Sequence, residues 1–297
     1  TINLQANLFD KSTITVGSLT ISVLKLKLKV PSEEIPHNAS VVFSYRYNDG
    51  EIQSEWVDRF KGKITKRTKY TDEVTSIEAK DKASNYDVFL DYFGDSISKY
   101  PANTRTVAQL CANHLGLTIE NINDVIDLDI VEYPNELTMV EMLKNIAINS
   151  GGNWVIIGDN LRLVTTGTYK NEVDYPAQSI ETSSLLNPIS KILMYYADEK
   201  AFESGNDTGS TLEIDSPWGT QESTNYVYSV LNGYEYVPIK VSGAYIDPAI
   251  ELGDIISIDG HDVLVANVNW VFDGIVTATI DVPINNEVNY DDPYNTL

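Results

Sequence analysis

One cysteine and three histidines are the side chains best suited to act as nucleophile, base or metal ligand. Cys111 alone cannot form an intrachain disulfide or a cysteine-based zinc site. It lies on the apolar stripe of an expected helix, which favours a small buried residue over an exposed nucleophile with a nearby base. His114 follows one turn later, where a protonated imidazole stabilises the helix C-terminus. His37 lies far from both in the sequence, and we expect His261 to be exposed in a tight turn.

Carboxylates are the other candidates, since the chain has 43 Asp and Glu residues. Asp124, Asp127 and Asp129 cluster, but a calcium loop also needs a glycine at its sharp turn and a trailing glutamate. Apolar residues interleave with these acids, so the polar edge of a strand explains the segment better. The motifs H-E-x-x-H, G-x-S-x-G, G-x-x-x-x-G-K-[ST] and G-x-G-x-x-G are absent. We therefore predict no catalytic, cofactor-binding or metal-binding residue, no cofactor and no enzyme activity, with a glycosidase-type carboxylate pair as the alternative.

Tyrosine is abundant, with 18 residues, several of which stand close together. Tyrosine is enriched in protein interfaces, and its ring also suits a sugar-binding surface. At period-two spacing it can equally form the half-buried face of a sheet, so both interpretations stay open. The groups are Tyr195 and Tyr196, Tyr226 and Tyr228, and Tyr234 and Tyr236.

The 297-residue chain carries a formal net charge of −22, which is unevenly distributed. Residues 1–82 hold 13 Lys and Arg against 11 Asp and Glu, whereas residues 83–297 hold 8 against 32. This acidity argues against sequence-specific nucleic-acid binding and against an anionic membrane surface, because both need a basic face. It suits a solubilising surface, a surface that repels a polyanion, or one that meets a basic partner. We also expect no membrane insertion and no secretory leader, because long apolar runs and a signal-peptide pattern are missing.

The hydrophobic periodicity divides the chain into three stretches. Between residues 14 and 82, apolar residues such as Leu24, Leu26 and Leu28 alternate with lysines, which predicts antiparallel strands. After residue 169 the pattern again predicts strands, including Ile189–Tyr196 and the strands that follow Leu252–Asp254.

Two helices and a hairpin are expected between these stretches. An apolar stripe from Val107 to Leu115 predicts the first helix, with Thr104 or Thr106 as its cap and Gly116 as its end. Thr138–Glu141 forms a capping box that starts the second. We therefore predict a mainly β fold with a small α/β insert, in which two tube-like antiparallel β-barrel domains accompany an α/β domain. The expected limits are 1–85 for the first barrel, 86–168 for the insert, 169–283 for the second barrel and 284–297 for a tail.

This order of domains resembles the central baseplate hub proteins of phage tails and related contractile injection systems, the late-control-D-like adaptors between tail tube and spike. Four stretches carry the resemblance and together span most of the chain. They are Phe60-x-Gly62-x-Ile64 followed by Ser76–Asp81, Thr106–Leu110, Leu137–Trp154 with the hairpin ending at Leu161–Leu163, and Leu252–Ile256 with the strands after it. The family acts through surfaces, so the resemblance assigns no catalytic residue and leaves the interface residues unknown.

The resemblance implies a homotrimer in the baseplate or tail tip of a virion, assembled in the bacterial cytoplasm. Two barrels from each of three subunits would form a pseudo-six-fold ring that joins a six-fold tail tube to a three-fold spike. The implied partners are other copies of the chain, a tail tube protein, a spike or tail-tip protein and a tape-measure protein. An acidic channel would let DNA pass without adhering. Two other functions remain open, a glycan- or receptor-binding tail-tip module and a carboxylate-dependent hydrolase of cell wall or polysaccharide.

Overall fold

Strands dominate the molecule, which we describe from a computed structural model. It describes residues 2–8, 15–46, 48, 50, 53–85, 101–130, 137–165, 169–182, 187–196, 200–235, 238–273 and 275–282. Three α-helices lie among these residues, so the predicted mainly β fold with a small α/β insert is confirmed. None of the helices in the described residues is long and apolar enough to cross a bilayer.

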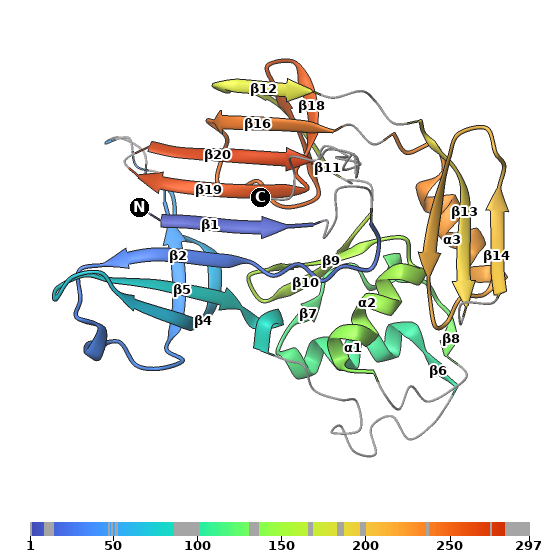
Figure 1. Cartoon of the computed structure of the whole chain (residues 1–297), viewed down its shortest axis with the longest axis horizontal. Coiled ribbons are helices and arrows are strands. Elements are labelled where there is room, and N and C mark those ends of the chain that lie inside the picture. The colour runs from blue at the N-terminus through green and yellow to red at the C-terminus, as the bar shows by residue number, and fades with distance from the viewer. Residues whose placement is uncertain are drawn as a thin grey trace, which may run out of the picture.

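A nine-stranded antiparallel sheet forms the body of the molecule and takes strands from both ends of the chain (Figure 1). Its order is β12-β16-β20-β19-β1-β2-β5-β4-β3, so the first strand joins the early strands to the late ones. These strands are β1 (Ile2–Asn7), β2 (Val23–Leu28), β3 (Ser40–Tyr45), β4 (Val57–Lys69), β5 (Thr75–Asp81), β12 (Ser179–Thr182), β16 (Ile239–Ala244), β19 (Asn267–Asp273) and β20 (Ile275–Val282). Both β regions expected from the sequence therefore contribute to one sheet.

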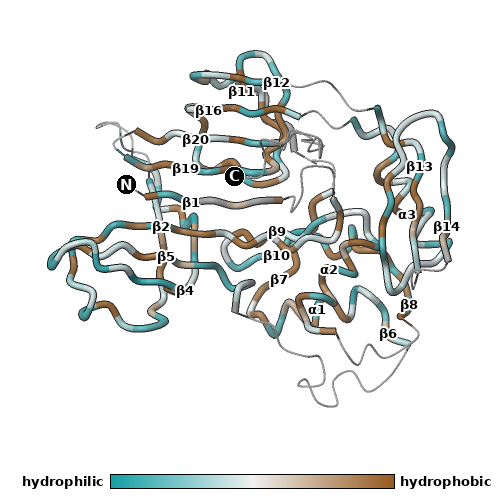
Figure 2. The backbone as a smooth tube through the Cα atoms, viewed as in Figure 1, coloured by the Kyte–Doolittle hydropathy of each residue, from teal (hydrophilic) through white to brown (hydrophobic). Residues whose placement is uncertain are grey.

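The alternation of leucine and lysine in β2 produces one buried and one exposed face of this sheet, as predicted. Leu24 is fully buried and lies opposite Leu4 of β1, which lies opposite Trp270 of β19. A single apolar core therefore continues from the early strands into the late ones. Lys25 and Lys27 point away from it and are exposed. Figure 2 shows hydrophobic stretches along β2, α2 and β13.

The α/β unit packs two helices against a small sheet. Its elements are α1 (Thr104–Leu115), α2 (Met139–Asn149), β7 (Thr118–Ile119), β9 (Asn153–Ile157) and β10 (Asn160–Val164), with the short pair β6 (Ala102–Asn103) and β8 (Asp129–Ile130) beside them. The capping box of Thr138 and Glu141 and the left-handed Gly116 at the end of α1 are confirmed. The predicted cap of α1 is wrong, because the Asn103 side chain accepts the hydrogen bond from the Arg105 backbone.

A second small unit after residue 187 contains a helix that the sequence analysis missed. Its central strand β13 (Ile189–Tyr196) pairs antiparallel with β14 (Lys200–Gly205) and parallel with β15 (Ser210–Asp215), and α3 (Gln221–Leu231) packs on one face. Two of the buried positions of α3 are Ser223 and Thr224. Because these residues are polar, the sequence of α3 lacks a continuous apolar stripe. Tyr226 and Tyr228 therefore lie on a helix and not in strands.

The last small sheet holds β11 (Tyr169–Tyr175), β17 (Asp254–Ile258) and β18 (His261–Leu264), in the order β11-β17-β18. The expected turn at Asp259 and Gly260 joins β17 to β18. Short 3-10 turns occur at Ser32–Glu34, Lys82–Asn85 and Ile122–Asp124. The domain limits at residues 85, 168 and 283 stay a prediction, and the expected tail at 284–297 and Tyr236 lie outside the described residues.

Candidate functional site

The side chains with catalytic potential lie apart from one another. Cys111 is fully buried in the core of the α/β unit, and burial raises its pKa to about 12, which confirms a packing role. His261 is exposed at the start of β18, as predicted, and His114 is exposed on the last turn of α1. His37 contacts the Arg67 guanidinium. Within the described ranges, no three His, Cys, Asp or Glu side chains converge as a metal site.

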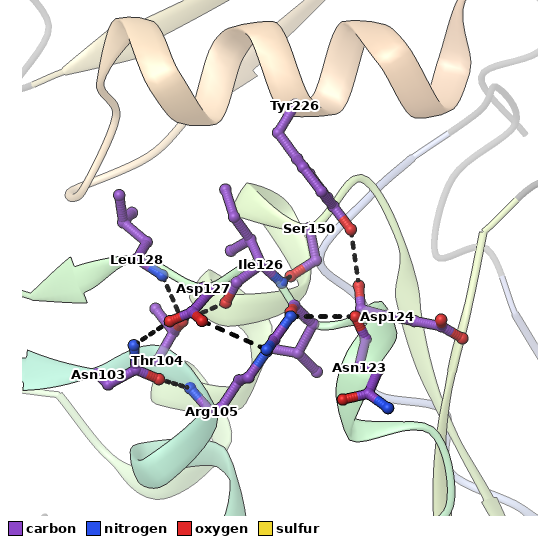
Figure 3. Close-up of polar contacts among 11 residues, drawn as sticks. Asn103, Thr104, Arg105, Asn123, Asp124, Ile126, Asp127, Leu128, Ser150 and Tyr226 are labelled. Atoms are coloured by element: carbon purple, nitrogen blue, oxygen red, sulfur yellow. Dashed lines mark hydrogen bonds and ion pairs between the residues drawn. The ribbon is translucent and has the colours of Figure 1, made fainter.

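The acidic segment from Asn121 to Ile130 lies across the start of α1 (Figure 3). Only Asp129 belongs to a strand, β8, so the expectation of a polar strand edge is wrong for Asp124 and Asp127. Val125, Ile126, Leu128 and Ile130, which alternate with the acids, are buried. The alternation of acidic and apolar residues therefore belongs to a loop, which its buried apolar side chains anchor.

Arg105 holds this segment in place (Figure 3). Its Nε donates a 2.9 Å hydrogen bond to the Val125 carbonyl, and an Nη donates a 3.1 Å bond to the Asn123 carbonyl. The other Nη lies 3.3 Å from Asp127, whose carboxylate also accepts a bond from Asn103. Asp127 therefore neutralises a guanidinium near the positive end of α1, which is a structural use of the acid.

Side chains of α1 and α3 and of the residue that follows α2 complete the contacts around the segment. Thr104 donates to the Ile126 carbonyl, and the Ser150 hydroxyl, just after α2, accepts a 3.1 Å bond from the Ile126 amide. Tyr226 of α3 donates a 3.1 Å bond to the Asp124 carbonyl. Burial raises the pKa of Tyr226. The segment thus links the α/β unit to the unit that carries α3, and neither Tyr226 nor the acids are arranged for catalysis.

The other tyrosines divide between packing and exposure. Tyr195 of β13 is half-buried and Tyr196 is exposed, and as neighbours in a strand they point to opposite faces of the sheet. Tyr234 is half-buried against the cores on both sides of it, and burial raises its pKa to about 12. Tyr195 therefore lies on a half-buried sheet face, whereas Tyr226 and Tyr228 pack from a helix. An interface role for the tyrosines stays a prediction.

A largely buried charge network connects the early strands, the α/β unit and the late strands. Arg59 of β4 lies 3.9 Å from Glu251 and donates a 2.6 Å hydrogen bond to the Ile250 carbonyl. Arg162 of β10 lies 3.3 Å from the other Glu251 oxygen and 2.6 Å from Glu120. Burial raises the pKa of Glu251 and lowers that of Arg59, against the attraction between the two charges.

Glu251 and Asp254 are the carboxylates that most resemble an acid–base pair, because burial raises the pKa of both. Asp254 accepts a 2.8 Å hydrogen bond from the Glu251 backbone, and two arginines hold the Glu251 side chain. The cavity beside them measures about 30 Å³. Arg59 Nε and Trp270 Nε1, whose residues line it, have no hydrogen-bond partner within the described residues. A cavity of this volume holds about one water molecule and is too small for a sugar. Glu251 and Asp254 therefore suit a structural role, in which they help to connect distant segments of the chain.

A second ionic contact connects the β9–β10 hairpin to the early strands. Asp159 at the hairpin turn lies 3.1 Å from Lys61 of β4 and 2.8 Å from Lys82. Hydrogen bonds from these two lysines lower the pKa of Asp159. Neither ionic contact is predictable from the sequence, because the partners are distant in the chain and the residue types are common.

No family model and no curated protein matches this sequence. Solved structures do match. The 43 kDa tail protein of prophage MuSo2 from Shewanella oneidensis is 11% identical with a TM-score of 0.55, over 94% of this chain and 93% of that one. Prophage tail protein gp18 from Listeria monocytogenes is also 11% identical, with a TM-score of 0.53, over 94% of this chain and 87% of that one. At this identity the likeness is one of fold, and nearly the whole chain shares it.

Proposed function

We propose that this chain is a structural protein of a phage-type tail and not an enzyme. The observation that carries the proposal is the shared fold with two prophage tail proteins over 94% of the chain. The packing of the candidate catalytic groups agrees with it, because Cys111 lies in a core and Glu251 lies between two arginines.

The finer proposal is a homotrimeric hub at the tail tip or baseplate that joins a six-fold tail tube to a three-fold spike. The single sheet built from both ends of the chain supports it, because each subunit then presents two β regions in a fixed relation. Three copies would present six such regions, which is the physical requirement for matching the two symmetries. The partners would be a tail tube protein, a spike or tail-tip protein and a tape-measure protein.

An acidic central channel is part of the same proposal. Residues 83–297 hold 32 of the 43 acidic residues, and a negative wall would repel DNA during its passage. A reconstruction of the assembled ring tests this part separately, since acids confined to the outer rim around a neutral or basic lumen would refute it.

Light scattering at several protein concentrations, followed by electron microscopy, tests the hub. We expect a mass of three 33.1 kDa subunits and a ring with an axial opening. A chain that stays monomeric at every concentration, and also in the presence of the tail tube and spike proteins of the same particle, would refute the hub. Lytic activity lost on Glu251→Gln alone would instead establish the hydrolase alternative.

A further inference from the structure

A cluster of lysines covers the exposed face of the early strands. We define the lysine face as Lys25 and Lys27 of β2, Lys63 and Lys66 of β4, and Lys80 of β5. Strand pairing places Lys63 directly opposite Lys80, and both Lys25 and Lys66 opposite Glu78. These side chains point away from the core, because their neighbours along each strand, among them Leu24, Ile64 and Ala79, are buried.

The lysine face carries more positive charge than the acids in its strand rows can offset. None of its five lysines has an ion pair in the part of the chain that the structure describes, and Lys27 lies 4.6 Å above the Tyr70 ring. Glu78 is the one acid in the registered rows described above. Like charges directly across two strands destabilise a sheet, so Lys63 and Lys80 carry a cost that an acidic partner would remove.

An acidic face of opposite charge lies on the unit that contains α3. The helix covers one side of the β14-β13-β15 sheet, and no helix of the described residues packs on the other side. We define the acidic face as Glu203 of β14, Leu193 and Tyr195 of β13, and Glu213 and Asp215 of β15, which strand pairing places side by side. Its centre is apolar and half-buried, and its acidic rim is exposed.

Part of this acidic rim is also without a cationic partner. Lys191 lies 3.3 Å from Glu203 and 3.0 Å from Asp207, so it offsets these two acids. Glu213 and Asp215 have no ion pair within the described residues. The two faces thus carry opposite charges, and each retains charge that no ion pair within the described residues neutralises.

The two faces lie toward opposite ends of the long axis of the molecule, with β4 and β5 at one end and β13 and β14 at the other (Figure 1). They therefore cannot meet within one copy. A contact between two different patches is heterologous, and repetition of such a contact closes a ring when the rotation fits.

We propose that the acidic face of one copy binds the lysine face of the next copy, head to tail. The inference rests on the proposed trimer and names the surfaces that build it. A groove of about 180 Å³ beside the lysine face supports it, because exposed Val42 and Lys63 line the groove. Lys61 and Lys82 also line it, and their charges are offset by Asp159 in the same lining. Val42 would contact the apolar centre formed by Leu193 and Tyr195, and Lys63 would contact the acidic rim around it.

Charge reversal on each face tests the inference. Lys63→Glu with Lys80→Glu, and separately Glu213→Lys with Asp215→Lys, should each raise the dissociation constant of the trimer by at least about 100-fold. The combined four-site variant should restore the trimer, since the charges are exchanged and remain complementary. Lys144→Glu on α2, compared with Lys63→Glu alone, is the control, with the same change in net charge away from the lysine face. Circular dichroism confirms folding of each variant. Wild-type trimers should also dissociate as salt rises from about 0.05 to 1 M.

The outcomes separate this inference from the proposed function. If the wild type forms trimers and both charge-reversal variants form them equally well, the head-to-tail docking is overturned and the hub proposal stands. A wild type that never associates would refute both the docking and the hub. Loss of the trimer in both reversals without rescue in the combined variant would also overturn the head-to-tail pairing. The same variants are titrated with labelled duplex DNA. Binding that Lys63→Glu and Lys80→Glu abolish, with the trimer unchanged, would mark the lysine face as a nucleic-acid surface and refute the inference.

Discussion

Replacing Gly253 with alanine tests how closely the late strands fit against the α/β unit. Gly253 has a φ of +89°, and its amide donates a 2.9 Å hydrogen bond to the Val265 carbonyl. A Cβ on Gly253 would stand 2.4 Å from Cγ1 of Val164, a distance that real Cβ atoms essentially never show. Val164 is 3% exposed and packs in the main core, so its side chain has little room to move.

Two costs add in this variant. The left-handed backbone costs a non-glycine residue about 1–2 kcal/mol. Overpacking of a well-filled core costs about 1–3 kcal/mol more. Gly253→Ala should therefore lower the free energy of unfolding by about 2–5 kcal/mol, a large share of the ~5–15 kcal/mol that stabilises a typical protein. Gly260→Ala is the matched control, because Gly260 has a φ of +77° with nothing within 4 Å of its Cβ position. Gly260→Ala should lower the free energy of unfolding by only about 1–2 kcal/mol, which is what a left-handed backbone costs a non-glycine residue.

Urea unfolding followed by circular dichroism measures both variants. Combining Gly253→Ala with Val164→Ala should cost less than the sum of the single changes, because the new methyl group enters the space left by the valine. A coupling of about 0.5–3 kcal/mol is the expected range for residues in contact. Equal losses for Gly253→Ala and Gly260→Ala, together with additive behaviour of the double variant, would refute the close fit.

Three further predictions concern single side chains. Iodoacetamide should leave Cys111 unmodified in the native protein and modify it in urea, because burial raises its pKa to about 12, and native labelling seen by mass spectrometry would contradict this. Thr138→Ala should lower the free energy of unfolding by about 1 kcal/mol through loss of the capping box, and Thr138→Ser should retain most of it in urea unfolding. The lowered pKa of Asp159 means that its contribution to stability is present above the unfolded-state value near 3.8 and is lost as pH falls through the folded-state value. Melting temperatures between about pH 5 and 2.5 should therefore fall more steeply for the wild type than for Asp159→Asn, and parallel curves would show that the lysine contacts contribute nothing.

Local rules predicted the α/β unit well, because its signals act within a few residues. Thr138 and Glu141 satisfy the first amides of α2 from inside the same turn, and Gly116 supplies the left-handed end of α1. The glycine of the Phe60-x-Gly62 stretch also has a physical explanation, since a Cβ there would stand 2.2 Å from the Lys80 carbonyl oxygen. The sequence could show that a glycine was present, but only the paired strand shows what it avoids.

The α3 helix was missed because its buried face is chemically mixed. Ser223 and Thr224 occupy buried positions beside Val227 and Leu231, and Thr220 forms its capping box with Ser223 instead of an acid. The signal that could have found the helix was the three-residue and four-residue spacing of Thr224, Val227 and Leu231. Strand patterns on both sides outweighed it.

The sequence by itself determined that β2 buries its leucines and exposes its lysines, where α1 ends and α2 begins, and how acidic the chain is. Periodicity, caps and composition act within one segment, so they can be read without the rest of the fold. The tertiary structure decided that β1 lies between β2 and β19, and that Glu251 meets both Arg59 and Arg162. It also decided that the lysine face and the acidic face lie at opposite ends of the molecule. Strand partners and ion pairs depend on packing between distant segments, and a hydrophobic pattern carries no information about which distant segment that is.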